Sequence, residues 1–315
     1  MARPGLWAGC ILLLAIALLW PFPPGDMARS LTHRLLRYVH SSRMAPNSLP
    51  VRIDLPKKLM WHQLHSFNPF NEWMAKLNWS LERQKDASHP FHADPYSLRL
   101  VKIQSFDCFG GDRIGFLKVA AEVANSAGES LPGVALLRGP SVAMLVMLIP
   151  DDDSSGEERY VVMTVQPRIP VGSMTFSELP AGMVDDAGSF KGAAAKEMEE
   201  ELGITIQDEE LICLSDMAAD DGGEAESDDN ERLASAMYPS AGGCDEYIKL
   251  YSVERRIPRQ QLRDWTGRLT GLRDEGEKIT LKLVPMKNLW REGARDAKAL
   301  GALALWEALR REGRL

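Results

Sequence analysis

The 315-residue sequence has little cysteine and no surplus of basic residues. Its four cysteines lie far apart and include no C-x-x-C pair, which argues against a disulfide framework or a zinc site and favours a reducing compartment. A net charge of −7 argues against a general nucleic-acid binder, so no nucleic-acid partner is expected. The apolar fraction of 45% and the charged fraction of 26% are ordinary for a globular protein, which excludes a disordered or fibrous chain.

The sequence also lacks an apolar run long enough for a stable membrane span. Residues 6–20 form a nearly unbroken apolar run of 15 residues, whereas a transmembrane helix needs about 20. The run fits a signal peptide, while residues 27–44, with four arginines and no acid, resemble a mitochondrial targeting segment. A start at Met44 would leave no leader. We expect residues 1–50 to lie outside the fold and the protein to be intracellular, mitochondrial or cytoplasmic, with a signal peptide or anchor left open.

The rest of the chain divides by pattern into two parts. Residues 51–97 are rich in aromatics at irregular helical spacing, which predicts a helical N-terminal extension of one or two short helices. Residues 98–312 contain several strand-like segments and a few helical ones, and this mixture predicts one α+β domain. Within it, the acidic window 220–231 predicts a solvated inserted loop. The expected strands are 98–106, 115–124, 141–149, 160–165, 248–253 and 278–284, and the expected closing helix is 296–311.

The most informative stretch, residues 177–204, contains a predicted helix. Ser189 is placed to cap its N-terminus, and Gly203 is placed to end it. The residues before the helix, 179–182, read Leu-Pro-Ala-Gly and predict a sharp turn whose exposed carbonyls offer a metal ligand. A capped helix after such a turn presents its side chains at a defined place.

Three glutamates of this helix, Glu197, Glu200 and Glu201, stand at i, i+3 and i+4. Their carboxylates therefore share one face, about 5–6 Å apart at Cβ. Like charges so close together destabilise a helix unless a cation binds between them. A hard cation that prefers oxygen ligands, Mg²⁺ or Mn²⁺, fits best.

The spacing of this stretch resembles the Nudix box. From Gly182 it reads G-x5-G-x7-K-E-M-x-E-E-x-G-I, against the family's G-x5-E-x7-R-E-U-x-E-E-x-G-U. Gly188 stands in place of the first glutamate, which leaves the number of metals open. Lys196 stands in place of an arginine and lacks its planar fork. The resemblance implies a Nudix-type α/β/α sandwich with a mixed sheet and a metal-dependent hydrolase.

The resemblance covers roughly residues 97–312 and is greatest to the ADP-ribose and ADP-sugar branch, in particular the plant-type ADP-sugar diphosphatases. It implies Mg²⁺-dependent hydrolysis of the diphosphate bond of an ADP-sugar, such as ADP-ribose or ADP-glucose, to AMP and a sugar phosphate. The segments that carry it are Arg138-Gly139-Pro140, Gln166-Pro167-Arg168, the residues 178–182, 239–246 and 271–277, and Asp296-Ala297-Lys298.

The same resemblance implies roles for individual residues. Arg168 is expected to bind the phosphates of the substrate, because a guanidinium binds phosphate in bidentate fashion. The alternative is that Arg168 only forms an ion pair at the surface. Glu275 and Glu277 are rival candidates for the general base. The expected metal ligands are Ala181, Glu197 and Glu201, the expected catalytic residues are Glu200 and, as the base on a glycine-rich loop, Glu246, and the expected substrate-binding residues are Arg138, Arg168 and Glu178.

Two other functions remain open at this stage. Gly188 and Lys196 favour a binding module that senses ADP-ribose-like ligands without cleaving them, whereas the retained carboxylates favour an enzyme. An enzyme with another substrate, such as a UDP-sugar or a dinucleotide, is the second alternative, because pocket shape decides that preference. Related ADP-ribose enzymes are often homodimers, so we expect a homodimer.

Overall fold

The computed structural model describes residues 51–184, 189–197, 199–200, 205–219, 233–271 and 278–315. The chain divides between residues 52 and 53, and the unit 53–315 is compact and contains nearly all the described residues. The leader, residues 1–50, and the acidic window, residues 220–231, lie outside the described residues. The division of the chain at residues 50 and 97 stays a prediction.

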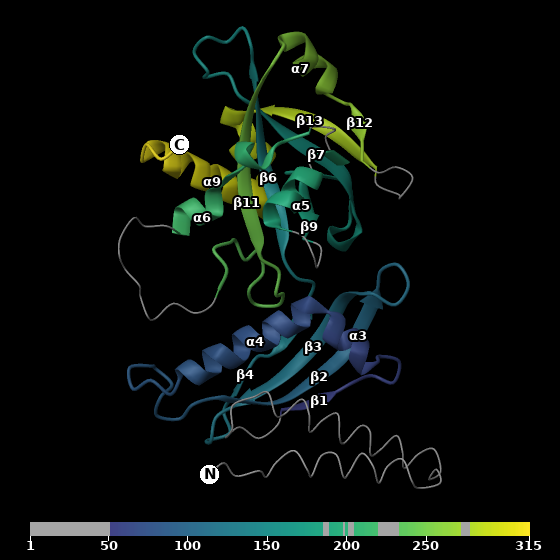
Figure 1. Cartoon of the computed structure of the whole chain (residues 1–315), viewed down its shortest axis with the longest axis vertical. Helices are drawn as coiled ribbons and strands as arrows, with labels where there is room; N and C mark the ends of the chain where they lie inside the picture. The colour runs from purple at the N-terminus through teal and green to yellow at the C-terminus, as the bar shows by residue number, and fades with distance from the viewer. Residues whose placement is uncertain (1–50, 185–188, 198, 201–204, 220–232, 272–277) are drawn as a thin grey trace, which may run out of the picture. The chain divides into compact units, whose positions relative to one another are not determined.

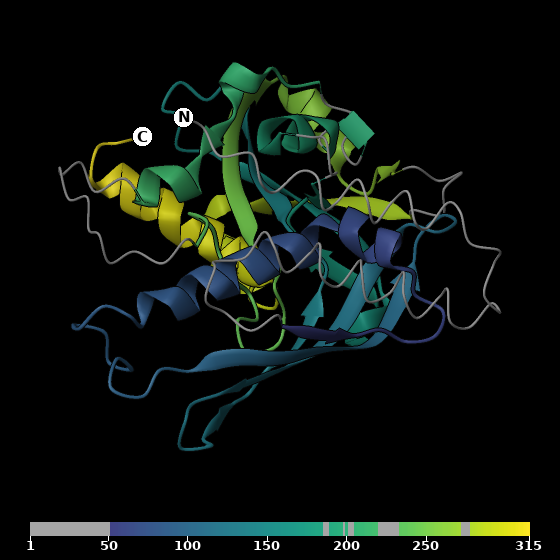
Figure 2. The ribbon, with the colours of Figure 1, turned by 60° about the horizontal axis from the view of Figure 1, so that its bottom comes forward.

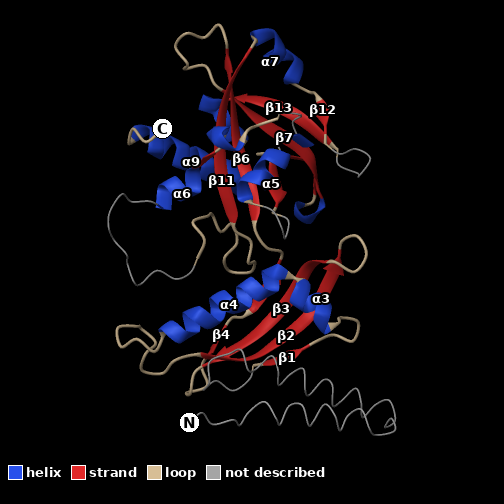
Figure 3. Ribbon diagram, viewed as in Figure 1, coloured by secondary structure: helices blue, strands red, loops and turns tan. Residues whose placement is uncertain are grey.

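Among the described residues of this unit, eight strands form a mixed sheet (Figures 1 and 3). Their order is β10-β11-β6-β7-β13-β12, with β9 paired to β6 and β8 paired to β7. β11 and β6 are parallel, and the other pairs are antiparallel. The strands are β6 (Ser141–Pro150), β7 (Tyr160–Arg168), β8 (Ser173–Glu178), β9 (Ala181–Met183), β10 (Ile212–Cys213), β11 (Ile248–Ile257), β12 (Leu269–Thr270) and β13 (Ile279–Pro285).

Helices cover both faces of this sheet. β6 is buried along its whole length, and its side chains point alternately into two cores, as expected for a strand covered on both sides. Val142 and Met144 pack with α5 and α7, while Ala143 and Leu145 pack with α6, α8 and α9. The expected α/β/α sandwich with a mixed sheet is therefore confirmed. The helices are α5 (Phe190–Glu197), α6 (Leu214–Ala219), α7 (Arg259–Trp265), α8 (Leu289–Glu292) and α9 (Ala297–Arg311), with 3₁₀ turns η1 (Ile169–Val171), η3 (Asp208–Glu210) and η5 (Met286–Asn288).

The segment before Ser141 forms a second sheet, of five strands among the described residues, with order β1-β2-β3-β4 and β5 paired to β3. Figures 1 and 2 show α4 lying along one face of this sheet. Two helices lie within 51–97. Phe67 separates them, and Pro69 lies in the first turn of the second helix, a position that suits proline. The elements are β1 (Arg52–Asp54), α3 (Trp61–Ser66), α4 (Asn68–Arg83), β2 (Ser97–Cys108), β3 (Ile114–Ala124), β4 (Ser130–Leu131) and β5 (Val134–Leu137).

The strands expected from sequence at 98–106, 115–124, 141–149, 160–165 and 248–253 all lie within observed strands, and the one expected at 278–284 begins one residue later, at Ile279. The closing helix is also confirmed, with the side chain of Asp296 accepting a hydrogen bond from the Lys298 amide as its N-cap. In the part of the chain that the structure describes, we find no helix with the length and apolar character of a bilayer span.

Candidate active site

The central sheet divides between β6 and β7. The two strands pair only at Met147–Val161 and Leu148–Tyr160. Beyond that point β6 pairs with β9 and β7 pairs with β8, so the chain from Glu178 to Ala181 crosses from one half of the sheet to the other. The division places two predicted site residues inside the sheet rather than at its edge.

The predicted sharp turn at 179–182 is wrong. Ala181 and Gly182 are extended and pair with Ala143 and Val142 of β6. The carbonyl of Pro180 accepts a hydrogen bond from the Met144 amide at 3.0 Å. The free edge of β6 offers backbone donors that an extended segment satisfies and a tight turn would not. Ala181 is half-buried in this strand and stays a predicted metal ligand.

The predicted helix follows as α5. Ser189 Oγ accepts a hydrogen bond from the Gly192 amide at 2.9 Å, so the expected N-cap is confirmed. Lys196 and Glu200 form a one-turn ion pair with Nζ and Oε1 3.9 Å apart. This pair contributes little because both side chains reach solvent.

Most of the predicted metal ligands lie outside the part of the chain whose side chains the structure describes. The side chain of Glu197 and the residues Gly188, Glu201 and Gly203 lie outside the description. Within the described ranges, no three acidic, histidine or cysteine side chains gather as a metal site would require. The ligand set therefore stays a prediction.

Glu178 lies in a cluster of four charged side chains. Its Oε1 accepts a hydrogen bond from Arg168 Nε at 2.6 Å, and its Oε2 accepts one from Lys298 Nζ at 2.9 Å. Lys298 Nζ also lies 2.9 Å from Asp296 Oδ1, and Asp296 Oδ2 accepts from the Leu179 amide at 2.9 Å. Glu178 and Asp296 are only 4% and 3% exposed, so these bonds replace the hydration that both carboxylates lost. We call this set the Glu178 cluster; it joins β7, β8 and α9.

Electrostatics keep the cluster charged. Burial by itself lowers the pKa of Lys298, but the neighbouring Asp296 and Glu178 carboxylates outweigh it and hold the pKa above its ordinary value. Lys298 therefore stays a cation at neutral pH. Both oxygens of Glu178 are engaged, whereas Arg168 uses only Nε in this pair and its side chain is 39% exposed. Glu178 thus orients a guanidinium whose remaining donors can meet a phosphate.

A second group joins Arg138 with the residues before β11. Arg138 Nη1 lies 3.4 Å from Glu246 Oε1, which also accepts from Ser141 Oγ at 3.1 Å. Asp245 accepts from the Arg138 amide at 2.7 Å and from the Gly139 amide at 3.2 Å. Burial raises the pKa of Asp245, although these two amides work against it. The parallel pairing of Ile248 with Ser141 is what brings the two predicted residues, Arg138 and Glu246, together.

This second group lies at the start of α5, away from the box carboxylates at its end. The ring of Tyr247, next to Glu246, is 6.2 Å from the ring of Phe190, the first residue of α5. Glu197 comes seven residues later, about 10 Å along a helix axis. The structure therefore brings Arg168 together with Glu178 and Arg138 together with Glu246. The rival bases, Glu275 and Glu277, lie outside the described residues.

Sequence reasoning assigned no role to Asp296, Lys298 or Ser141. The first two were visible as part of a family-like segment before the last helix, but the pairing of Lys298 with Glu178 spans 120 positions. Ser141 is an ordinary strand residue in the sequence. Only the strand order reveals its contact with Glu246.

Comparison with known proteins assigns the chain to a family. The NUDIX domain matches residues 140–303. The chain belongs to the Nudix family. Over 246 residues it is 39% identical to "Nudix hydrolase 14, chloroplastic" of Arabidopsis thaliana, covering 78% of this chain and 71% of that protein. A solved structure described as "Crystal structure of ADP compounds hydrolase" is 20% identical, with a TM-score of 0.38, over 70% of this chain and 99% of that chain.

The protein is thus a Nudix hydrolase, an enzyme that acts on phosphorus anhydrides, as the sequence predicts. Nudix hydrolases generally use a divalent metal. The residue types expected to bind it suit such an ion in their chemistry, since glutamate carboxylates and a backbone carbonyl are hard oxygen ligands. The NUDIX match begins at Pro140, so the five-stranded sheet and α4 precede it.

Proposed function

We propose that this Nudix hydrolase cleaves the diphosphate bond of ADP-sugars, of the ADP-ribose or ADP-glucose type, and releases AMP and a sugar phosphate. The observation that carries the proposal is the exposed guanidinium of Arg168, held by the buried Glu178 beside the strand that leads into the Nudix box. A fixed guanidinium suits the paired anionic oxygens of a diphosphate. The name of the similar Arabidopsis protein, a Nudix hydrolase, supports the same reaction class.

In this proposal Glu197 and Glu201 hold Mg²⁺, or Mn²⁺ in its place, with the Ala181 carbonyl as a further ligand and Glu200 beside them. When bound, the metal neutralises the diphosphate charge and activates water. Arg168 binds the diphosphate, and Glu178 keeps Arg168 in position. Arg138 binds another part of the substrate.

The contacts favour a different base from the first candidate. The Oε1 atom of Glu246 is already engaged by Arg138 and Ser141, and it lies near the start of α5. The segment 271–277 leads into β13, whose Thr280 pairs with Val165, three residues before Arg168. We therefore propose that Glu275 or Glu277 takes the proton from water and that Glu246 positions Arg138.

Three glutamine variants test this assignment. The base variant, Glu275→Gln or Glu277→Gln, should lower kcat about 100-fold or more with KM and Mg²⁺ affinity nearly unchanged. Glu246→Gln should mainly raise KM. A large fall in kcat for Glu246→Gln alone would restore Glu246 as the base. A higher Mg²⁺ requirement in any variant would make that residue a metal ligand instead.

A substrate panel tests the reaction itself. We expect ADP-ribose or ADP-glucose to give the highest kcat/KM among ADP-ribose, ADP-glucose, ADP-mannose, UDP-glucose and NADH, with chromatography showing AMP as a product. A preference for UDP-glucose would make this a UDP-sugar hydrolase. Tight binding of ADP-ribose without turnover in Mg²⁺ or Mn²⁺ would instead identify a sensor.

We also propose import into an organelle and assembly as a homodimer. The similar Arabidopsis protein is named as chloroplastic, which supports organellar targeting, and residues 27–44 have the composition of a targeting segment. Fusing residues 1–50 to a fluorescent protein should direct it to mitochondria or plastids; a diffuse cytoplasmic signal would contradict import. Sedimentation of the purified protein tests the dimer.

A further inference from the structure

Two buried residues, Leu179 and Pro180, carry the chain from β8 to β9, and we call them the crossing. Proline has no N–H, so the Leu179 amide is the one backbone donor that the crossing has. Its partner is a side chain and not a strand, because Asp296 Oδ2 accepts from it at 2.9 Å. The place of the crossing therefore depends on a residue that lies 117 positions later in the chain.

The backbone that carries this carboxylate is held between two helices. Asp296 is the N-cap of α9, and its amide donates to the Gly293 carbonyl at 2.9 Å, just after α8. A Cβ on Gly293 would lie 2.8 Å from the Cβ of Ala299, so the turn between α8 and α9 is closely packed. Leu179 lies in the same hydrophobic core as Leu289 of α8 and Ala299 of α9. The crossing and the cap of α9 are thus joined by packing as well as by a hydrogen bond.

The cap of α9 has more acceptors than helix capping requires. Asp296 Oδ1 accepts from the Lys298 amide at 3.1 Å and from Lys298 Nζ at 2.9 Å, and Oδ2 is left for the Leu179 amide. Serine caps helices about as well as aspartate, but it has a single oxygen. Capping by itself therefore does not account for a carboxylate at this position.

The two oxygens of Asp296 lead to two parts of the proposed active site. Oδ1 leads through Lys298 to Glu178, whose other oxygen holds Arg168. Oδ2 leads through the crossing to Ala181, and the proline ring between them fixes one backbone angle. One buried carboxylate thus connects the anchor of the proposed diphosphate ligand to the strand of the proposed metal ligand.

We propose that Asp296 is a positioning residue that couples the metal-binding and diphosphate-binding parts of the active site. This inference rests on the proposed function, because it takes Ala181 as a metal ligand and Arg168 as a diphosphate ligand. Mg²⁺ tolerates little distortion of its ligands, so a carbonyl donor next to the crossing must be held in place. A buried ionic set contributes little net stability compared with apolar packing, which agrees with a role in placement.

Asp296→Ser tests the coupling, because serine can still cap α9 but lacks the oxygen that holds the Leu179 amide. We expect the Kd for Mn²⁺, measured by EPR without substrate, to rise at least about tenfold. The Mg²⁺ concentration for half-maximal activity should rise with it. The matched control is Ala304→Gly, which weakens the same helix at an exposed position and should leave the Kd for Mn²⁺ unchanged.

A second measurement needs only the wild type, so it decides the matter even if Asp296→Ser does not fold. If the bond between Asp296 and the Leu179 amide favours metal binding, metal binding must favour that bond by the same factor. We expect Mg²⁺ to slow hydrogen exchange of the Leu179 amide at least about tenfold in NMR measurements. The control is the Leu250 amide, which is also held by a buried side chain, Ser215 Oγ at 3.0 Å, and should be unaffected.

Several results would overturn the inference. They are an unchanged Kd for Mn²⁺ in Asp296→Ser, the same loss in Ala304→Gly, and equal slowing, or none, of the two amides by Mg²⁺. A wild type that binds no Mn²⁺ would overturn both this inference and the proposed metal site. If the wild type binds Mn²⁺ but cleaves no ADP-sugar, the proposed function alone fails, and Mn²⁺ affinity and amide exchange still decide the role of Asp296.

Discussion

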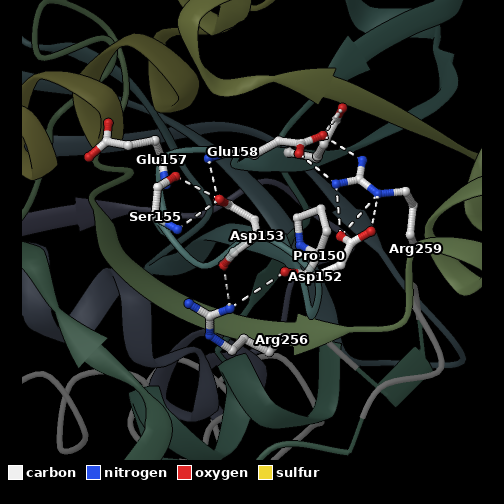
Figure 4. Close-up of polar contacts among 9 residues, drawn as sticks. Pro150, Asp152, Asp153, Ser155, Glu157, Glu158, Arg256 and Arg259 are labelled. Atoms are coloured by element: carbon white, nitrogen blue, oxygen red, sulfur yellow. Dashed lines mark hydrogen bonds and ion pairs between the residues drawn. The ribbon is translucent and has the colours of Figure 1, made fainter.

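Two ionic networks in this protein use the same pairing chemistry in different surroundings. In the Glu178 cluster the carboxylates are almost completely buried. At the β6–β7 turn, Arg259 pairs with Glu158 at 2.7 Å and with Asp152 at 2.8 Å, and Arg256 donates to the Asp153 carbonyl at 3.0 Å (Figure 4). The side chains of Arg259, Glu158 and Asp152 are all more than a third exposed.

The difference in burial decides what each network can contribute. At the turn, each charge can return to water, so the pairs contribute little to the free energy of unfolding. In the Glu178 cluster a charge that loses its partner stays buried and poorly hydrated, so removing one member lowers the free energy of unfolding strongly. The turn network tethers a loop, whereas the Glu178 cluster fixes the Arg168 guanidinium, which we propose binds the diphosphate.

The largest effect should come from Glu178→Gln. The change leaves Lys298 with Asp296 alone and Arg168 without its anion, so we expect the free energy of unfolding to fall by roughly 3 kcal/mol. Activity should fall as well, because Arg168 is no longer oriented. Urea denaturation measures the first effect. A loss below about 1 kcal/mol would place this cluster with the surface pairs.

Glu201→Gln should separate activity from stability. We expect kcat to fall at least about 100-fold, equivalent to about 2.7 kcal/mol in the barrier. The free energy of unfolding in urea should not fall, because removing one of three neighbouring like charges relieves repulsion. EDTA should likewise abolish turnover by the wild type. Near-normal kcat in the variant would mean that the metal site lies elsewhere.

Arg168→Lys should have an intermediate effect. Lysine keeps the positive charge but loses the fork that holds Glu178 and a phosphate together, so kcat/KM should fall about tenfold. The free energy of unfolding should fall less than in Glu178→Gln, since Glu178 keeps Lys298. Equal kcat/KM for variant and wild type would remove Arg168 from substrate binding.

The smallest effect should come from Arg259→Gln. Hydrogen bonds from Arg259 and then Tyr160 lower the pKa of Glu158 to about 2. A depressed pKa gives stability that is present above the ordinary value, 4.5, and is lost as the pH falls toward 2. Arg259→Gln should move the NMR-measured pKa of Glu158 back toward 4.5, with little change in unfolding at pH 7. An unmoved pKa would contradict the assigned cause.

Much of the fold could be predicted because its signals are local. The continuous apolar run of β6 and the apolar spacing of α9 record burial directly, and the Nudix box has fixed spacing without gaps. The prediction from sequence was wrong at 179–182, where Pro-Ala-Gly is typical of a turn. There the unpaired edge of β6, a feature of the tertiary structure, outweighed the local preference.

The site was less predictable because its contacts join distant elements. No local pattern indicates that Lys298 pairs with Glu178 or that the Ser141 hydroxyl donates a hydrogen bond to Glu246.

The most direct measurement is a ³¹P NMR time course of ADP-glucose with the enzyme and Mg²⁺. If the diphosphate bond is cleaved, the two diphosphate signals should disappear together while AMP and glucose 1-phosphate appear in equal amounts, and EDTA should stop the change. Persistence of the diphosphate signals with Mg²⁺ or Mn²⁺, or the appearance of ADP and free glucose, would contradict the proposed reaction.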